Sequence, residues 1–175
     1  MIEGIDSLTS KLNMLATKVI EENAVKVCSN GIKIVQASAK LNCPVNDGEL
    51  RQSIKTAVRK TDTGAIAECY TNKEHGMYVE FGTGKKGDES HSGISPSVNV
   101  AYTLDPWWIH ESMVDKKTAE KYKWFSIETK DGIFYQVTGQ AAQPFMYPAI
   151  RDNEKRIKKN MGNYLSRKIR EEAGK

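Results

Sequence analysis

Two glycines followed by two lysines, Gly82-Thr83-Gly84-Lys85-Lys86, are the residues whose types most suggest phosphate binding. A phosphate loop of the G-x-x-x-x-G-K-[ST] type needs wider glycine spacing, a Ser or Thr after the lysine and a helix behind it. Here the glycines are only two positions apart, no Ser or Thr follows the lysine, and the next residues have loop composition. The pattern favours the end of a short helix followed by a polar loop.

The histidines and cysteines form no pattern typical of metal binding or nucleophilic catalysis. His75, His91 and His110 are far apart in the sequence, and neither H-E-x-x-H nor a paired Cys/His spacing is present. Cys43 or Cys69 could pair with a histidine on paper, but no local motif such as G-x-S-x-G supports a nucleophile. We therefore expect no catalytic residues, no metal site and no cofactor.

The C-terminal segment offers a different chemistry, because its cations could contact nucleic-acid phosphates. The basic residues there are Arg151, Lys155, Arg156, Lys158, Lys159, Arg167, Lys168 and Arg170. A well-formed apolar stripe opposite them favours the solvated face of an amphipathic helix, and the net charge of the chain is only +4. A small basic nucleic-acid-binding protein that uses this helix is the alternative function.

Trp107 and Trp108 are neighbours in a stretch that holds all three tryptophans of the chain. Tryptophan is enriched at interface hot spots, so the pair is a candidate anchor for a partner protein. The pair could equally fill the core beneath a long loop. Both interpretations stay open at the level of sequence.

The bulk composition suits one cytoplasmically made domain. The chain has 175 residues, of which 39% are hydrophobic and 27% are charged. Its three cysteines, Cys28, Cys43 and Cys69, are odd in number and scattered, which is typical of reduced thiols. The N-terminus has no secretory pattern, and no window reaches the roughly 20 apolar residues of a membrane span.

Helical patterns at both ends enclose two hairpin patterns. We expect one or two helices over residues 6–42, a hairpin of strands 54–60 and 65–71, a short helix that ends at Gly82, and a terminal helix over 148–172. Residues 85–122 are irregular, and a second hairpin turns at Lys130-Asp131-Gly132. These elements predict an α+β fold, in which an antiparallel sheet of hairpins packs against the N-terminal and C-terminal helices in a single domain of residues 1–175.

The order of three short motifs makes a family resemblance visible. The segment "CPVNDGELRQSIK" is followed by a hairpin, then by "YVEFGTG", and finally by "AQPFMYPAI" at the start of a charged helix. This order resembles the tail-component family of long-tailed bacteriophages, the head–tail joining or tail-completion proteins. The resemblance runs through nearly the whole chain, with an irregular Trp-containing insertion at about residues 85–140.

The resemblance implies that sixteen residues are structural landmarks of the family. They are Gly48, Leu50, Arg51, Ser53, Ile54, Tyr78, Val79, Glu80, Phe81, Gly82, Thr83, Gln143, Pro144, Phe145, Pro148 and Ala149. Pro144 forces an extended conformation on Gln143, and Pro148 is tolerated in the first turn of the last helix. We expect Phe145 to enter the core beside Phe81, which would join the second and third motifs.

The resemblance also implies a function without catalysis. It points to a bacteriophage or prophage structural protein that acts in virion morphogenesis, at the head–tail junction or the head-proximal end of the tail. The implied partners are connector and tail-tube proteins and further copies of the chain in a ring, whereas membrane and nucleic-acid partners are not expected. The implied location is the virion, after synthesis in the bacterial host cytoplasm.

Overall fold

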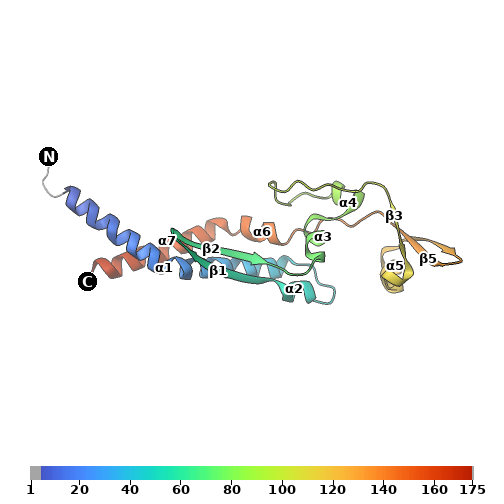
Figure 1. Cartoon of the computed structure of the whole chain (residues 1–175), viewed down its shortest axis with the longest axis horizontal. Coiled ribbons are helices and arrows are strands. Elements are labelled where there is room, and N and C mark those ends of the chain that lie inside the picture. Colours follow the sequence, from blue (N-terminus) through green and yellow to red (C-terminus); the bar gives the residue numbers. More distant parts are fainter. Residues whose placement is uncertain (1–4, 175) are drawn as a thin grey trace. The chain divides into compact units, whose positions relative to one another are not determined.

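The computed structural model describes residues 5–174 and has the α+β fold class that the sequence predicts (Figure 1). Its strands form two small antiparallel sheets, one with the order β1-β2 and one with the order β3-β5-β4. The described chain groups into two compact units. The first unit combines residues 5–72 with 145–174, and the second comprises residues 73–144. That the two units make a single domain stays a prediction.

The first unit is built on one long helix, whereas the sequence left open whether residues 6–42 form one helix or two. Its elements are α1 (Ile5–Asn42), α2 (Glu49–Ser53), β1 (Lys55–Thr61), β2 (Gly64–Tyr70), α6 (Met146–Arg151) and α7 (Glu154–Ala173). The β1–β2 hairpin turns at Asp62-Thr63, since Thr61 pairs with Gly64. Helix α1 packs against this hairpin and also against α6 and α7.

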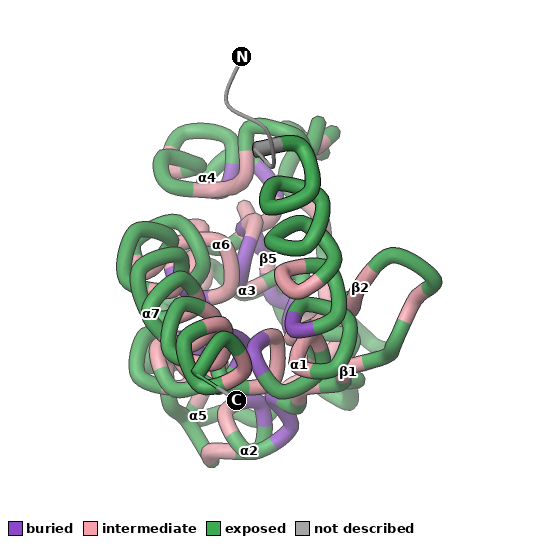
Figure 2. Tube along the Cα trace, turned by 90° about the vertical axis from the view of Figure 1, so that its left-hand side faces the viewer, coloured by how far each residue is buried: buried purple, intermediate pink, exposed green. Residues whose placement is uncertain are grey.

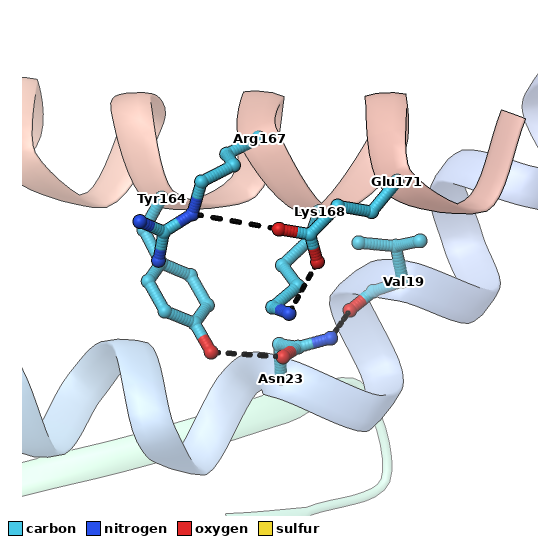
Figure 3. Close-up of polar contacts among 6 residues, drawn as sticks. All are labelled: Val19, Asn23, Tyr164, Arg167, Lys168 and Glu171. Atoms are coloured by element: carbon cyan, nitrogen blue, oxygen red, sulfur yellow. Dashed lines mark hydrogen bonds and ion pairs between the residues drawn. The ribbon is translucent and has the colours of Figure 1, made fainter. Parts of the chain in front are cut away.

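Helices α1 and α7 run antiparallel, and small residues set how closely they approach. A Cβ atom built on Gly31 would lie 3.1 Å from Cγ2 of Ile157, so the absent side chain leaves room for α7. The hydroxyl of Tyr164 donates a hydrogen bond to Oδ1 of Asn23 at 3.2 Å (Figure 3). Glycine at position 31 therefore permits close packing of α1 and α7.

The predicted single C-terminal helix is wrong in one detail, because α6 and α7 are separated by a turn at Asp152-Asn153. Asp and Asn favour turns because their short side chains hydrogen-bond to nearby backbone. Here Nδ2 of Asn153 donates to the carbonyl oxygen of Ala149 at 2.9 Å. Pro148 lies in the first turn of α6, as predicted.

The second unit contains more regular structure than its composition suggests. Its elements are α3 (His75–Phe81), α4 (Gly84–Glu89), β3 (Trp107–His110), a 3-10 turn (Glu111–Met113), α5 (Lys116–Tyr122), β4 (Phe125–Thr129) and β5 (Gly132–Val137). The hairpin predicted at Lys130-Asp131-Gly132 is confirmed as β4–β5. The polar loop predicted directly after Gly82 is wrong for residues 84–89, which form α4.

Helix α5 covers only one face of the three-stranded sheet. On the covered face Tyr135 and Val137 are buried, and the ring of Trp124 lies 6.3 Å from the ring of Tyr135. Ala119 of α5 is buried as well. Because side chains alternate along each strand, the neighbours of these residues point to the opposite face.

Candidate interaction site

The C-terminal end of α3 is where the second and third motifs meet. The last carbonyl groups of a helix have no partner within it and need donors from elsewhere. The amide of Gln143 donates to the carbonyl oxygen of Val79 at 2.8 Å, and Nε2 of Gln140 donates to that of Tyr78 at 2.7 Å. The hydroxyl of Tyr102 donates to the carbonyl oxygen of Phe81 at 2.8 Å. Two segments that are distant in sequence, residues 140–143 and the loop with Tyr102, thus cap one short helix.

Directly after α3 the chain forms an isolated antiparallel bridge between Thr83 and Gln140. Their backbones exchange two hydrogen bonds, of 2.9 and 3.1 Å. The glycines around the bridge allow the backbones to touch. A Cβ atom on Gly82 would lie 2.7 Å from the nitrogen of Ala142, and one on Gly139 would lie 1.9 Å from the oxygen of Thr83. Both glycines also have positive φ angles, which L side chains rarely adopt.

These contacts assign the glycines of the Gly-Thr-Gly-Lys-Lys segment to packing. Gly84 packs against the ring of Trp107, since its Cβ atom would lie 2.9 Å from Cζ3 of that ring. The segment is preceded by a helix where a phosphate loop has a strand. Lys85 forms an exposed ion pair with Glu89 at 3.8 Å. The segment therefore lacks the geometry of a phosphate loop, although a short helix does follow it.

An open hollow of about 420 Å³ lies beside this junction within the second unit. Its lining combines the exposed side of α3 with residues of the loop before β3. The lining residues include Met77, Tyr78, Phe81, Tyr102 and Trp107. Burial, and secondarily the nearby Asp88, raise the pKa of the Tyr102 hydroxyl. The hydroxyl is therefore protonated and a donor at neutral pH. The hollow is mainly apolar. Of its aromatic groups, Trp107 packs against Gly84, and Tyr102 caps the end of α3.

The first motif forms a separate structural junction in the first unit. Gly48 has φ of 86° and leads into α2, and Leu50 and Ile54 are buried. Ser53 donates to the carbonyl oxygen of Leu50 at 2.7 Å and lies 2.6 Å from the hydroxyl of Thr71. Arg51 donates from Nη2 to the carbonyl oxygen of Cys43 at 3.1 Å. These side chains tie the end of α1 to the hairpin.

The third motif spans the boundary between the two units. Gln143 and Pro144 belong to the second unit, whereas Phe145 and Ala149 are fully buried in the first. Phe81 is half-buried in the second unit. The predicted packing of Phe145 beside Phe81 stays a prediction. Glu80 of the second motif is buried too.

The register of β3 places the side chains of Trp107 and Trp108 on opposite faces of the sheet. Trp107 pairs with the buried Val137 and packs on Gly84, so it serves the interior of the second unit. Trp108 pairs with Gln136 and is 42% exposed, with its ring 6.1 Å from that of Phe125. Trp107 is therefore half-buried and packed, whereas Trp108 is exposed on the surface.

The remaining polar groups do not gather into a reactive site within residues 5–174. No group of three His, Cys, Asp or Glu side chains there could hold a metal ion. None of the three cysteines forms a disulfide. Burial raises the pKa of the Cys69 thiol, although the charge of Lys40 partly opposes this shift. Among the described helices none is both long and apolar enough to cross a bilayer.

Several cations of α7 are paired within the helix. Lys158 contacts Glu154 at 2.5 Å, while Arg167 and Lys168 both contact Glu171 (Figure 3). The charge of Lys158 and its hydrogen bond lower the pKa of Glu154, which keeps that carboxylate ionised and paired at neutral pH. Pairing of this kind is typical of a solvated helix face and leaves less charge for phosphates.

Residues 6–82 match the family model described as "Bacteriophage HK97-gp10, putative tail-component". The predicted resemblance to phage tail components is therefore confirmed over this segment, which holds the first motif and the second as far as Gly82. The third motif lies outside the match. No curated protein and no solved structure matches the chain.

Sequence reasoning missed several residues that the site depends on. Tyr102 and Gln140 cap α3 from segments that had no recognisable pattern. Phe125 and Ile127, which flank Ser126 on β4, are also exposed with Trp108. The alternation of apolar and polar residues in β4 is a signal that could have found the last two, since it predicts one shared face.

Proposed function

We propose that the protein is a non-catalytic structural component of a bacteriophage or prophage virion, which acts at the head–tail junction or the head-proximal end of the tail. The match of residues 6–82 to a phage tail-component family carries this proposal. The remaining residues 83–174 supply a second sheet with an exposed aromatic face, which suits a protein that works by contact.

The chemistry of the motif residues supports an architectural role. Gly82 and Gly139 permit backbone contact, while Gln140 and Gln143 satisfy helix carbonyl groups. Groups committed to such bonds are not available to orient or activate a reactant. Gly48, Leu50, Arg51, Ser53 and Ile54 have equally structural surroundings in the first unit. The proposed mechanism is therefore assembly, with affinity from exposed apolar side chains.

The proposed partners are connector and tail-tube proteins, together with copies of the same chain in a ring on the virion. A head-to-tail contact between identical subunits closes into a ring where the rotation permits. Trp108 is the candidate anchor on the surface, whereas Trp107 supports it from the interior.

The test is a nonsense mutation of this gene in the phage or prophage that carries it. We expect filled heads and finished tails to accumulate unjoined after induction, as counted by electron microscopy. Purified protein added to that lysate should restore joined, infectious particles. Normal yields of joined virions without the protein would contradict the proposal.

The alternative, binding of nucleic acid by α7, makes a separate prediction. The first unit carries 17 basic and 11 acidic residues, a net charge of +6, so some attraction to phosphates is expected at low salt. A true DNA-binding surface would bind tightly and lose affinity steeply with salt. We expect only weak binding, which charge reversal at Lys155 and Lys159 would not change at physiological salt.

A further inference from the structure

Two exposed apolar surfaces of this chain, one in each unit, remain uncovered after folding. The first is the open face of the three-stranded sheet, defined by Trp108, Phe125 and Ile127. The second is the N-terminal stripe of α1, defined by Leu8, Leu12 and Leu15. Large apolar side chains that cluster on a surface are typical of interaction sites.

The open face follows from the register of the sheet. Trp108 and Phe125 both pair with Gln136 of β5, while His110 and Ile127 both pair with Phe134. Residues paired in this way share one face. Trp108, Phe125 and Ile127 are 42%, 63% and 39% exposed, whereas Tyr135 and Val137 on the opposite face are buried. The ring contact between Trp108 and Phe125 holds two aromatic groups in place before any partner arrives.

The stripe exists because α1 is longer than the helix that covers it. Leu8, Leu12, Leu15 and Val19 share one helical face by their spacing. Val19 is 1% exposed, whereas Leu12 and Leu8 are 52% and 59% exposed. Figure 2 shows the first turns of α1 as exposed throughout.

The position of α7 explains where this cover ends. Asn23 of α1 contacts Tyr164, and Gly31 faces Ile157. Eight residues of α1 therefore lie alongside seven residues of α7, as expected for two antiparallel helices with the same rise per residue. Helix α7 ends at Ala173, nine residues beyond Tyr164. The segment of α1 that precedes about residue 14 therefore has no counterpart on α7.

The charges of the two units complement each other. The second unit has 8 basic and 10 acidic residues, a net charge of −2, against +6 for the first. The same relation holds locally, because Lys11 and Lys18 flank the stripe along one edge by helical spacing. At the end of the open face His110 contacts the backbone of Asp131, and Glu111 accepts from the amide of Ile133. The Glu111 carboxylate thus lies at one end of the open face, whereas the ammonium groups of Lys11 and Lys18 lie beside the stripe.

We infer that the open face of one copy binds the N-terminal stripe of α1 in a second copy of this chain. This inference deepens the proposed function, since it supplies the head-to-tail contact of the proposed ring. Because the two surfaces differ, the contact is heterologous, and each subunit uses one surface for each neighbour. In this contact Leu8 and Leu12 of one copy lie against Trp108 and Phe125 of the next copy. Lys11 is then directed toward the end of the open face that carries Glu111.

Two matched variants test the inference by mixing. The face variant is W108A/F125S and the stripe variant is L8Q/L12Q, and all four positions are exposed, so both variants should fold. The controls are Met113→Gln and Met14→Gln. Met113 is 79% exposed and Met14 is 73% exposed, and neither belongs to the residues that define the two surfaces. Sedimentation velocity is run from about 10 µM to about 1 mM, the range in which contacts of small interfaces are populated.

A heterologous contact predicts a specific pattern. The wild type and both controls should form dimers and higher species, and each double variant alone should stay monomeric. An equal mixture of the two variants should form a 1:1 dimer and nothing larger, because one intact surface of each kind remains. Wild type that stays monomeric at all concentrations, variants that assemble normally, or a mixture without dimers would overturn the inference.

This experiment is independent of the test of the proposed function. If the gene is needed for joining heads to tails but the mixture shows no dimer, the structural role stands and this contact is wrong. If the mixture dimerises but virions join without the protein, the contact stands and the proposed role is wrong.

Discussion

The backbone amide of Gln143 donates a hydrogen bond to the carbonyl oxygen of Val79 at 2.8 Å, which joins two motifs that are 64 residues apart in the sequence. With the Thr83–Gln140 bridge, this bond makes the end of α3 a junction of backbones. A junction of this kind tolerates few side-chain atoms.

Gly139→Ala should destabilise the second unit by at least about 2 kcal/mol. The new Cβ atom would lie 1.9 Å from the carbonyl oxygen of Thr83, at a residue whose φ is 95°. Urea unfolding followed by tryptophan fluorescence measures this effect, because all three tryptophans belong to the second unit. Gly162→Ala in α7 is the control, since nothing lies within 4 Å of its Cβ position. That change should stabilise the first unit by about 0.5–1 kcal/mol in circular dichroism.

Tyr102→Phe should lower the free energy of unfolding of the second unit by about 0.5–1.5 kcal/mol, the net value of one hydrogen bond. The change removes only the hydroxyl that donates to Phe81. Tyr122→Phe, at an exposed ring, should change stability by less than about 0.5 kcal/mol. Equal effects of the two changes would show that the Tyr102 bond does not stabilise the junction.

Ionisation of Tyr102 should also weaken the fold at high pH. Burial and the nearby Asp88 raise the pKa of this hydroxyl. A raised pKa means that the stabilisation is fully present below the ordinary tyrosine pKa of about 10, and is lost as the pH rises through the higher folded value. Tyrosinate absorbance at 295 nm should show one late-titrating tyrosine in the wild type that is absent in Tyr102→Phe.

Trp107→Ala and Trp108→Ala should separate stability from surface presentation. Trp107 packs against Gly84, so its removal should cost about 2 kcal/mol or more. Trp108 is exposed, and its removal should cost less than about 0.5 kcal/mol. Urea midpoints followed by circular dichroism give both values. A larger loss for Trp108 than for Trp107 would mean that the side-chain register of β3 is wrong.

Lys40→Gln should slow alkylation of Cys69. Burial raises the pKa of this thiol, and the positive charge of Lys40 partly counteracts the rise. Without that charge less thiolate is present at pH 8, and the thiolate is the species that reacts. Iodoacetamide labelling with peptide-level mass spectrometry measures the rate. Lys11→Gln is the control, and an unchanged Cys69 rate in Lys40→Gln would contradict the assignment.

The sequence by itself determined the helices at both ends, the two hairpins and the α+β class, because periodicity and turn residues act locally. It also determined that Gly82 of the second motif ends a helix. It missed α4, since a six-residue helix of Gly, Lys and Asp has little helical propensity and is held by its surroundings. It likewise missed the turn between α6 and α7, where Asn153 bonds back to Ala149.

Only the tertiary structure decided which of the two tryptophans is packed and which is exposed. Adjacent residues of a strand point to opposite faces, but which face is covered depends on where α5 packs. The same holds for α1, whose apolar stripe is uniform in sequence and changes from exposed Leu8 to buried Val19 where α7 ends. Whether a residue is buried depends on which other element packs against it. The sequence pattern of a single helix or strand does not show which element that is.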